Sequence, residues 1–138
     1  LLSLGAIELL STKEIQMGAR PLESSMWAGA VDSLGGEPLA WLTRTMQPEG
    51  VIASIGNAAG IDLHTTVMPF ILRGVRLIGV NSDNSPATTQ RIWRRLANDL
   101  RPSHLQSIAR VIPFDELPRA IDAVIAGKIK GRTVVQID

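Results

Sequence analysis

The sequence predicts the later part of an open α/β domain, in which helices cover both faces of a parallel sheet. Short β-branched runs alternate with helical segments along its 138 residues, which is the pattern of a parallel sheet. Residues 1–6 resemble the last turn of a helix closed by Gly5, and an apolar strand is expected at residues 7–10. Because the chain starts inside a strand–helix–strand unit, we expect part of the domain to lie upstream.

The composition is that of an ordinary globular domain, with 45% hydrophobic residues, 20% charged residues and a formal net charge of +1. Aromatic residues make up only 4%, which argues against a nucleic-acid surface. The absence of cysteine excludes disulfides, thiolate catalysis and cysteine-ligated zinc. His64 and His104 stand apart, so no metal site is expected. No apolar run approaches the ~18 residues of a membrane span. We therefore expect a cytoplasmic, metal-free domain.

The predicted elements follow from hydrophobic spacing and from capping residues. Buried or short strands are expected at residues 27–33, 51–55, 76–82, 110–114 and 133–137. Helices are expected at 37–47 and, short and well buried, at 65–73. A third helix is expected to begin after Ser85 and to bury Ile92, Trp93, Leu96 and Leu100. A fourth is expected to begin at the capping residue Asp115 and to end at Gly127. Residues 13–25 are expected to form a weak helix or a surface loop, and residues 48–50 to end the first long helix.

Three successive strands end in small or polar residues, at 33–36, 56–60 and 81–84. Ligands of open parallel sheets bind beyond the carboxyl ends of the strands. Glycine allows a ligand close to the backbone, and Asn and Ser supply donors and acceptors. Each segment alone is best explained as a turn, but three together favour a ligand-lined crevice. The G-x-G-x-x-G phosphate fingerprint and the P-loop are both absent.

Several charged or titratable residues have two interpretations. Asp32 could lie near a ligand, but a strand-end Asp more often accepts hydrogen bonds from adjacent backbone amides. His64 could be a general acid or base, although a solvent-facing or capping histidine is the simpler interpretation, and His104 is expected on the surface. The basic stretch at 128–132 could be a solvated loop, or Arg132 could contact a phosphate.

Five segments resemble a known family when they are read in order. They are Ser3–Ala6, Arg20–Leu22, Trp27–Ser33, Thr65–Arg73 and Gly131–Val135. Together they resemble the quinone oxidoreductase branch of the medium-chain dehydrogenase/reductase superfamily, and within it the acryloyl-CoA-reductase-like group. The match extends over essentially the whole chain, and Thr65–Arg73 is its most specific part.

The resemblance implies an NADPH-dependent, zinc-independent reductase that transfers hydride to an activated double bond or to a quinone. It implies a GroES-like catalytic domain, then a Rossmann domain, then a return of the chain to the catalytic domain. Residues 1–102 would be the later Rossmann strands, without the glycine fingerprint. Residues 103–138 would be the returning segment, which agrees with a change in character of the sequence at Pro102.

The family pattern also implies site residues and a partner. Gly35, Gly56 and Asn57 would line the cofactor crevice. Leu63, Asn81 and Ser82 would lie toward the nicotinamide. Arg132, in the terminal motif, would also reach the cofactor. Relatives often carry Asp where this sequence has Asn81, and no residue is assigned as the proton donor. Family members pair as homodimers through an edge strand, here Arg76–Ser82. The alternative is a non-catalytic α/β interaction module that dimerises through the same strand.

Overall fold

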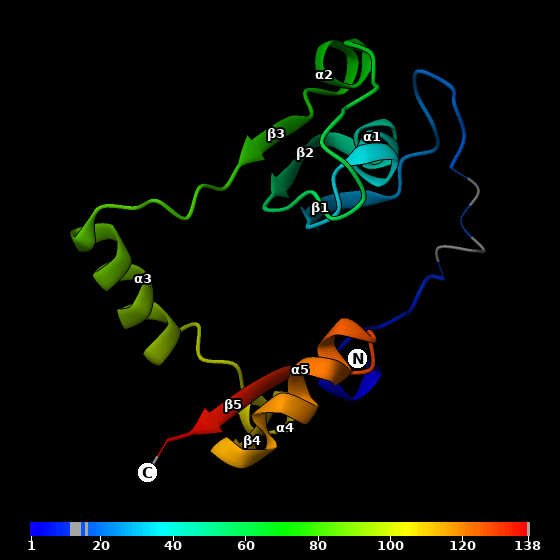
Figure 1. Ribbon diagram of the computed structural model, residues 1–138. Coiled ribbons are helices and arrows are strands. Elements are labelled where there is room, and N and C mark those ends of the chain that lie inside the picture. Colours follow the sequence, from blue (N-terminus) through cyan, green and yellow to red (C-terminus); the bar gives the residue numbers. More distant parts are fainter. Residues whose placement is uncertain (12–14, 16, 138) are drawn as a thin grey trace. The chain divides into compact units, whose positions relative to one another are not determined.

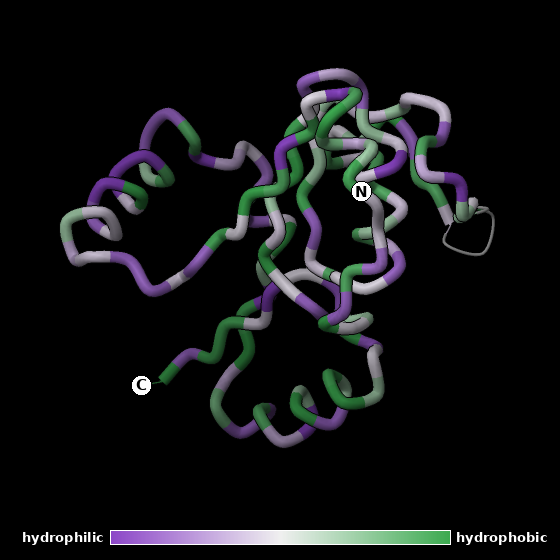
Figure 2. Tube along the Cα trace, turned by 90° about the horizontal axis from the view of Figure 1, so that it is seen from above, coloured by the Kyte–Doolittle hydropathy of each residue, from purple (hydrophilic) through white to green (hydrophobic). Residues whose placement is uncertain are grey.

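The computed structural model describes residues 1–11, 15 and 17–137. They form two compact units, one of residues 7–84 and one of residues 1–6 together with 85–138. Figure 1 shows the helices and strands of each unit, and Figure 2 shows hydrophobic residues alternating with hydrophilic ones along the coiled segments. Residues 13, 14 and 16 of the predicted loop at 13–25 lie outside the described residues, and the rest of that segment contains no helix or strand.

The first unit is built on a three-stranded parallel sheet. Its strands are β1 (Trp27–Asp32), β2 (Met46–Ser54) and β3 (Arg76–Gly79), hydrogen-bonded in the order β1-β2-β3. Helix α1 (Gly36–Thr45) connects β1 to β2, and helix α2 (Met68–Arg73) precedes β3. The predicted parallel α/β arrangement is therefore confirmed in this unit.

The core of the first unit follows from the spacing of apolar residues in and after α1. Leu39 and Met46 are buried, and Leu42 packs against their cluster, which also contains Ile52 and Val75. Leu39 and Leu42 are three positions apart and share one face of α1. The helix predicted at 37–47 ends earlier, at Thr45, so Met46 reaches the core as the first residue of β2 and not from the helix face. The rings of Trp27 and Trp41 pack edge to face with centroids 6.2 Å apart, which joins β1 to α1.

Arg73, the last residue of α2, ties three segments of this unit together. Its guanidinium donates hydrogen bonds to the carbonyl oxygens of Arg44 at 3.0 Å, of Met46 at 2.9 Å and of Glu23. The first two acceptors lie at the junction of α1 and β2, and the third lies in the segment before β1. Arg73 therefore holds that junction and the incoming chain on α2.

Two strand predictions were wrong in detail. Residues 7–10 form no strand, and Ile7 is 99% exposed, because no described strand pairs with this segment. Residues 48–50, which were predicted to end the first long helix, belong to β2, and the helix ends before them at Thr45. The pairing with β1 shifts between Trp27 and Gly29, and this irregularity accommodates the extra residues of β2 and a positive φ of 61° at Glu49.

The predicted burial of several apolar residues was also wrong. The sequence predicted a buried strand at 27–33, but in β1 only Asp32 is buried, and Val31 is 74% exposed. Helix α2 is shorter than the predicted helix at 65–73, and Pro69 is its only buried residue. Both corrections have one cause: within the described unit, these apolar side chains have no second layer to cover them.

The second unit is smaller and has little core. Strands β4 (Ala109–Pro113) and β5 (Arg132–Gln136) pair in parallel. Its helices are η1 (Leu2–Leu4), α3 (Pro86–Ala97), α4 (Leu105–Ile108), η2 (Phe114–Glu116) and α5 (Leu117–Ile125). Gly5 follows η1 with φ of 104°, which confirms the predicted glycine-closed turn. The division of the chain at Pro102 stays a prediction.

The helices of the second unit confirm two capping predictions and contradict others. The Ser85 hydroxyl accepts the backbone N–H of Thr88 at 3.3 Å at the start of α3, and Gly127 ends α5 with φ of 65°. Asp115 does not cap α5, because it lies inside the preceding turn η2. The apolar face predicted to be buried is exposed in this unit; it comprises Ile92 (43%), Trp93 (66%), Leu96 (38%) and Leu100 (50%).

Candidate functional site

The carboxyl ends of the three parallel strands of the first unit lie at one edge of the sheet. Ser54 of β2 is paired with Asp32 of β1 on one side and with Gly79 of β3 on the other. The segments that follow, 33–36, 56–60 and 81–84, therefore leave the sheet in the same direction. This places five of the predicted site residues at or next to this edge: Gly35, Gly56, Asn57, Asn81 and Ser82.

Asp32 organises this edge through a buried carboxylate that is 3% exposed. Its Oδ1 accepts the backbone N–H groups of Leu34 at 3.1 Å and of Gly35 at 3.0 Å. Its Oδ2 accepts the N–H of Gly35 at 3.2 Å and the hydroxyl of Ser54 at 3.1 Å. The simpler interpretation of Asp32, a strand-end carboxylate that binds adjacent amides, is thereby confirmed.

Glycine is required at positions 35 and 56 by the close approach of two backbones. Gly35 has φ of 66°, and a Cβ there would collide with the carbonyl oxygen of Gly60. A Cβ on Gly56 would lie 2.7 Å from the carbonyl oxygen of Ser33. The Ala59 N–H donates to Leu34 O at 2.7 Å, so the two loops are hydrogen-bonded together. These glycines shape the edge by letting the loops touch each other.

The uncharged polar side chains at this edge are exposed. Asn57 lies between the two glycines of its loop, and Asn81 and Ser82 follow β3. Asn81 Oδ1 accepts the backbone N–H of Asp83 at 2.9 Å, which fixes the turn and leaves its amide N–H₂ group for other partners. The edge therefore offers amide and hydroxyl groups, a donor set that suits ribose hydroxyls and a carboxamide.

Leu63 and His64 lie in the segment between the second loop and α2, and both are exposed. This segment is fixed at Thr65, whose hydroxyl lies 2.7 Å from the hydroxyl of Thr43 in α1. Thr43 is fully buried and also donates to the carbonyl oxygen of Ala40 at 2.7 Å. The interpretation of His64 as a solvent-facing residue agrees with its exposure.

Arg132 belongs to the second unit, where it is the exposed first residue of β5. It follows Gly131, which has φ of 78° and lies against the backbone of Ile108. The same unit contains a cavity of about 500 Å³, which has Arg110, Lys128 and Lys130 among its lining residues. The predicted basic stretch is therefore confirmed as exposed, while a phosphate contact of Arg132 stays a prediction.

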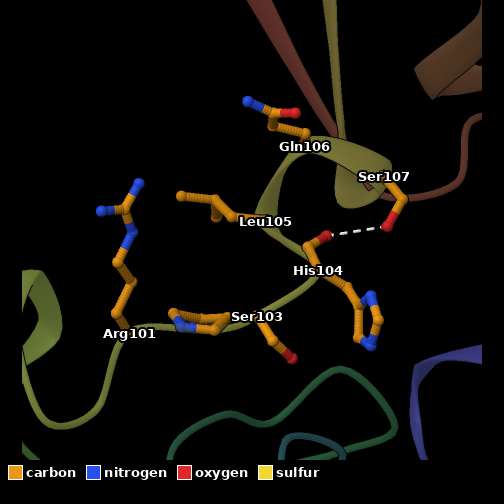
Figure 3. Close-up of a pocket in the computed structure, with 7 residues that line it drawn as sticks. Arg101, Ser103, His104, Leu105, Gln106 and Ser107 are labelled. Atoms are coloured by element: carbon orange, nitrogen blue, oxygen red, sulfur yellow. Dashed lines mark hydrogen bonds between the residues drawn. The ribbon is translucent and has the colours of Figure 1, made fainter.

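Two further cavities hold little that could bind a specific ligand. One of about 560 Å³ is lined by residues 101–107 alone. Figure 3 shows that the side chains of Arg101, His104 and Gln106 diverge there. The hydrogen bond drawn in the figure joins Ser107 Oγ to the His104 carbonyl oxygen at 2.8 Å. The other, about 190 Å³, lies beside β1 and is mostly apolar, with Trp41 among its lining residues. His104 is exposed, as predicted.

The Glu23 carboxyl, in the segment before β1, has a clearly perturbed pKa. The Arg20 side chain donates two hydrogen bonds to Glu23 Oε2, at 3.1 and 2.7 Å. These bonds hold the pKa of the Glu23 carboxyl below its ordinary value, although partial desolvation acts in the opposite direction. Among the described residues, no three His, Asp or Glu side chains gather as a metal site would require, and no helix is long and apolar enough to cross a membrane.

Sequence reasoning did not identify Ser54 as a contributor to this edge, nor Thr43 as the partner of Thr65. Both are hydroxyl residues whose partners, Asp32 and Thr65, lie 22 positions away in the sequence. The available signal for Ser54 was its place at the end of a predicted strand. Its partner becomes evident only from the register between β1 and β2.

The fold and the strand-end loops define the class of protein: a Rossmann-like nucleotide-binding fold of the kind found in oxidoreductases. No protein-family model matches the chain. The acrylyl-CoA reductase AcuI of Ruegeria pomeroyi is 39% identical over 140 residues, which is 100% of this chain and 42% of that protein. The chain thus spans about two fifths of the relatives that it matches.

Two solved structures match nearly the whole chain. YhdH of Escherichia coli K-12, with bound NADPH, is 42% identical with a TM-score of 0.87. YhfP of Bacillus subtilis, with NAD bound, is 35% identical with a TM-score of 0.90. Each match covers 99% of this chain and 42% of the other. More distant alcohol dehydrogenase structures share the fold.

The sequence resemblance is therefore confirmed. Its homologues are the acrylyl-CoA reductase AcuI and the quinone oxidoreductase YhfP, its structural neighbours belong to the medium-chain dehydrogenase/reductase superfamily, and the chain corresponds to a part of those proteins.

Proposed function

We propose that this chain is the cofactor-lining part of an NADPH-dependent, zinc-independent reductase that acts on an activated C=C bond, such as that of acrylyl-CoA, or on a quinone. The observation that carries the proposal is the match of 99% of this chain, at 42% identity, to a part of YhdH, whose structure contains NADPH. The strand-end edge is compatible with it, because Asn57, Asn81 and Ser82 expose amide and hydroxyl groups there and its buried carboxylate, Asp32, is already hydrogen-bonded.

The proposed roles of individual residues follow the family pattern. Gly35, Gly56 and Asn57 line the cofactor crevice from the loops after β1 and β2. Leu63, Asn81 and Ser82 lie toward the nicotinamide, and Arg132 reaches the cofactor. When bound, the nicotinamide supplies the hydride. The chain's own residues bind and orient the cofactor through backbone N–H, amide and hydroxyl groups.

We propose that residues 1–102 belong to the Rossmann domain and residues 103–138 to the catalytic domain of the complete protein, which we place in the cytoplasm. No described residue is assigned as a proton donor. His64 and His104 are both exposed, and no carboxylate or cation is their hydrogen-bond partner in the described part of the chain.

The activity is tested with the complete protein that carries this sequence. Purified protein is mixed with NADPH and acrylyl-CoA, and the loss of NADPH absorbance is followed. We expect turnover with acrylyl-CoA or, failing that, with a quinone such as a benzoquinone. A folded protein that oxidises NADPH with neither acceptor contradicts the proposed reaction and favours a non-catalytic interaction module.

We also propose that two copies associate through the segment Arg76–Ser82. Strand β3 lies at one edge of the described sheet, and β1 lies at the other. Ile78 in β3 is 49% exposed, and Val80, directly after the strand, is 53% exposed. An exposed edge strand with apolar side chains is a template for pairing with a second chain. Ile78→Lys should therefore convert a dimer to a monomer in sedimentation experiments, whereas Ile71→Lys on α2 should not. A dimer that persists in Ile78→Lys contradicts this interface.

A further inference from the structure

Asp32 is a buried carboxylate whose hydrogen-bond partners are all neutral. Its two oxygens receive four contacts of 3.0–3.2 Å, from Leu34, Gly35 and Ser54. A buried charge is costly unless its lone pairs are satisfied. Here backbone N–H groups and a hydroxyl satisfy them, and such bonds to a charged acceptor are stronger than neutral ones.

These contacts lie at the base of both loops that line the proposed crevice. Leu34 and Gly35 are in the loop after β1, and Ser54 is the last residue of β2, directly before the loop at 56–60. The loops are further joined by the Ala59 N–H donating to Leu34 O at 2.7 Å and by the Ile55 N–H donating to Asp32 O at 2.8 Å. A change at the carboxylate therefore reaches both loops at once.

We propose that Asp32 is a positioning residue of the cofactor site: its carboxylate fixes the loops at 33–36 and 56–60 in the single arrangement that presents Gly35, Gly56 and Asn57 to the cofactor. Asp32 does not contact the cofactor itself in this proposal and acts on it through Gly35, Gly56 and Asn57. The inference rests on the proposed NADPH binding and assigns the residue that pre-organises it.

The residue type is suited to this role. A carboxylate accepts hydrogen bonds at both oxygens, whereas an amide of the same shape accepts at one and donates at the other. Asp32→Asn preserves volume but directs an N–H₂ group at the Gly35 N–H in either orientation, together with the Leu34 N–H or the Ser54 hydroxyl. The loss of one charge-assisted bond should loosen both loops without opening a cavity.

The test compares NADPH binding and steady-state kinetics of the complete protein carrying Asp32→Asn, Ser54→Ala or Ile52→Val. Ile52 is a fully buried residue of β2 in the same sheet, so its truncation destabilises the fold without removing a contact of the loops. We expect Asp32→Asn to raise the Kd and the KM for NADPH about tenfold, the effect of one lost bond to a charged group. Ser54→Ala should raise them by a smaller factor. The acceptor KM should change less than about twofold, since the loops contact only the cofactor.

The outcomes separate this inference from the function on which it rests. If the unaltered protein does not bind NADPH, both are overturned. If it binds and Asp32→Asn binds equally well, only the positioning role of Asp32 is overturned. If Ile52→Val, at an equal loss of stability, weakens NADPH binding as much as Asp32→Asn, the effect is one of stability and the inference is again overturned. Should Asp32→Asn fail to fold, Ser54→Ala decides, because it removes one bond and retains those to the backbone.

Discussion

The contact between the two glycine-containing loops gives the sharpest prediction of stability. Gly35 and Gly127 both have a positive φ, of 66° and 65°, but Gly35 has a ψ of −157°, which lies outside the left-handed helical region. A Cβ on Gly35 would collide with the carbonyl oxygen of Gly60 and lie 3.2 Å from the Cα of Asn57, whereas a Cβ on Gly127 would meet no atom within 4 Å. The two positions therefore differ in the space around the added methyl group, and Gly35 also has a backbone conformation that is almost confined to glycine.

The expected free energies follow from this difference. An alanine at a positive φ costs about 1–2 kcal/mol at position 127 and at least as much at position 35, where ψ lies outside the left-handed region. Overpacking against neighbouring backbone adds about 1–3 kcal/mol at position 35 only. Gly127→Ala should therefore lower the free energy of unfolding by about 1–2 kcal/mol, and Gly35→Ala by about 2–5 kcal/mol. The reduced entropy of the unfolded chain is common to both and cancels in the comparison.

The assay is equilibrium unfolding in urea, followed by tryptophan fluorescence, of the unaltered protein and both variants. We also expect Gly35→Ala to weaken NADPH binding and Gly127→Ala to leave it unchanged, because only the former separates the loops of the proposed crevice. Equal losses of stability in the two variants would refute the close packing of the loops at 33–36 and 56–60.

Two further predictions concern the segment before β1 and its attachment. Arg73→Met should lower the free energy of unfolding by about 2–4 kcal/mol in urea titrations, because three carbonyl groups lose a charged donor. Arg76→Met should cost less than about 1 kcal/mol, since Arg76 is exposed and makes one 3.4 Å bond, and equal costs would contradict the role of Arg73. Arg20→Gln should raise the pKa of Glu23 toward its ordinary value in an NMR titration. Because the folded-state pKa is lowered, this pair stabilises the fold above the unfolded-state pKa, and that contribution is lost as the pH falls through the folded-state pKa; an unchanged Glu23 pKa would contradict the pairing.

The sequence predicted those parts of the fold that depend on local spacing. The three-residue spacing of Leu39 and Leu42 predicted the face of α1 that reaches the core, whereas Met46 reaches it from the start of β2. Ser85 and Gly127 predicted helix boundaries because capping depends on a few neighbouring residues. The main interpretation of Asp32 was likewise local, since two of its partners are two and three residues away.

The predictions that failed depended on contacts between distant parts of the chain. Spacing alone could not tell whether the apolar face of α3, which includes Trp93, would be covered, and it is exposed in the described unit. Residues 7–10 have the composition of a strand, but a strand exists only with a hydrogen-bonded partner. The bond between Ser54 and Asp32 depends on the register of β1 against β2, which no local pattern specifies.

The measurement that tests the central claim most directly is hydrogen–deuterium exchange of the complete protein with and without saturating NADPH. We expect the cofactor to slow exchange in the loops at 33–36, 56–60 and 81–84, because they leave the same edge of the sheet and line the proposed crevice. Slowed exchange confined to other segments, or no saturable binding by the folded protein, would contradict the assignment of this edge as the NADPH site.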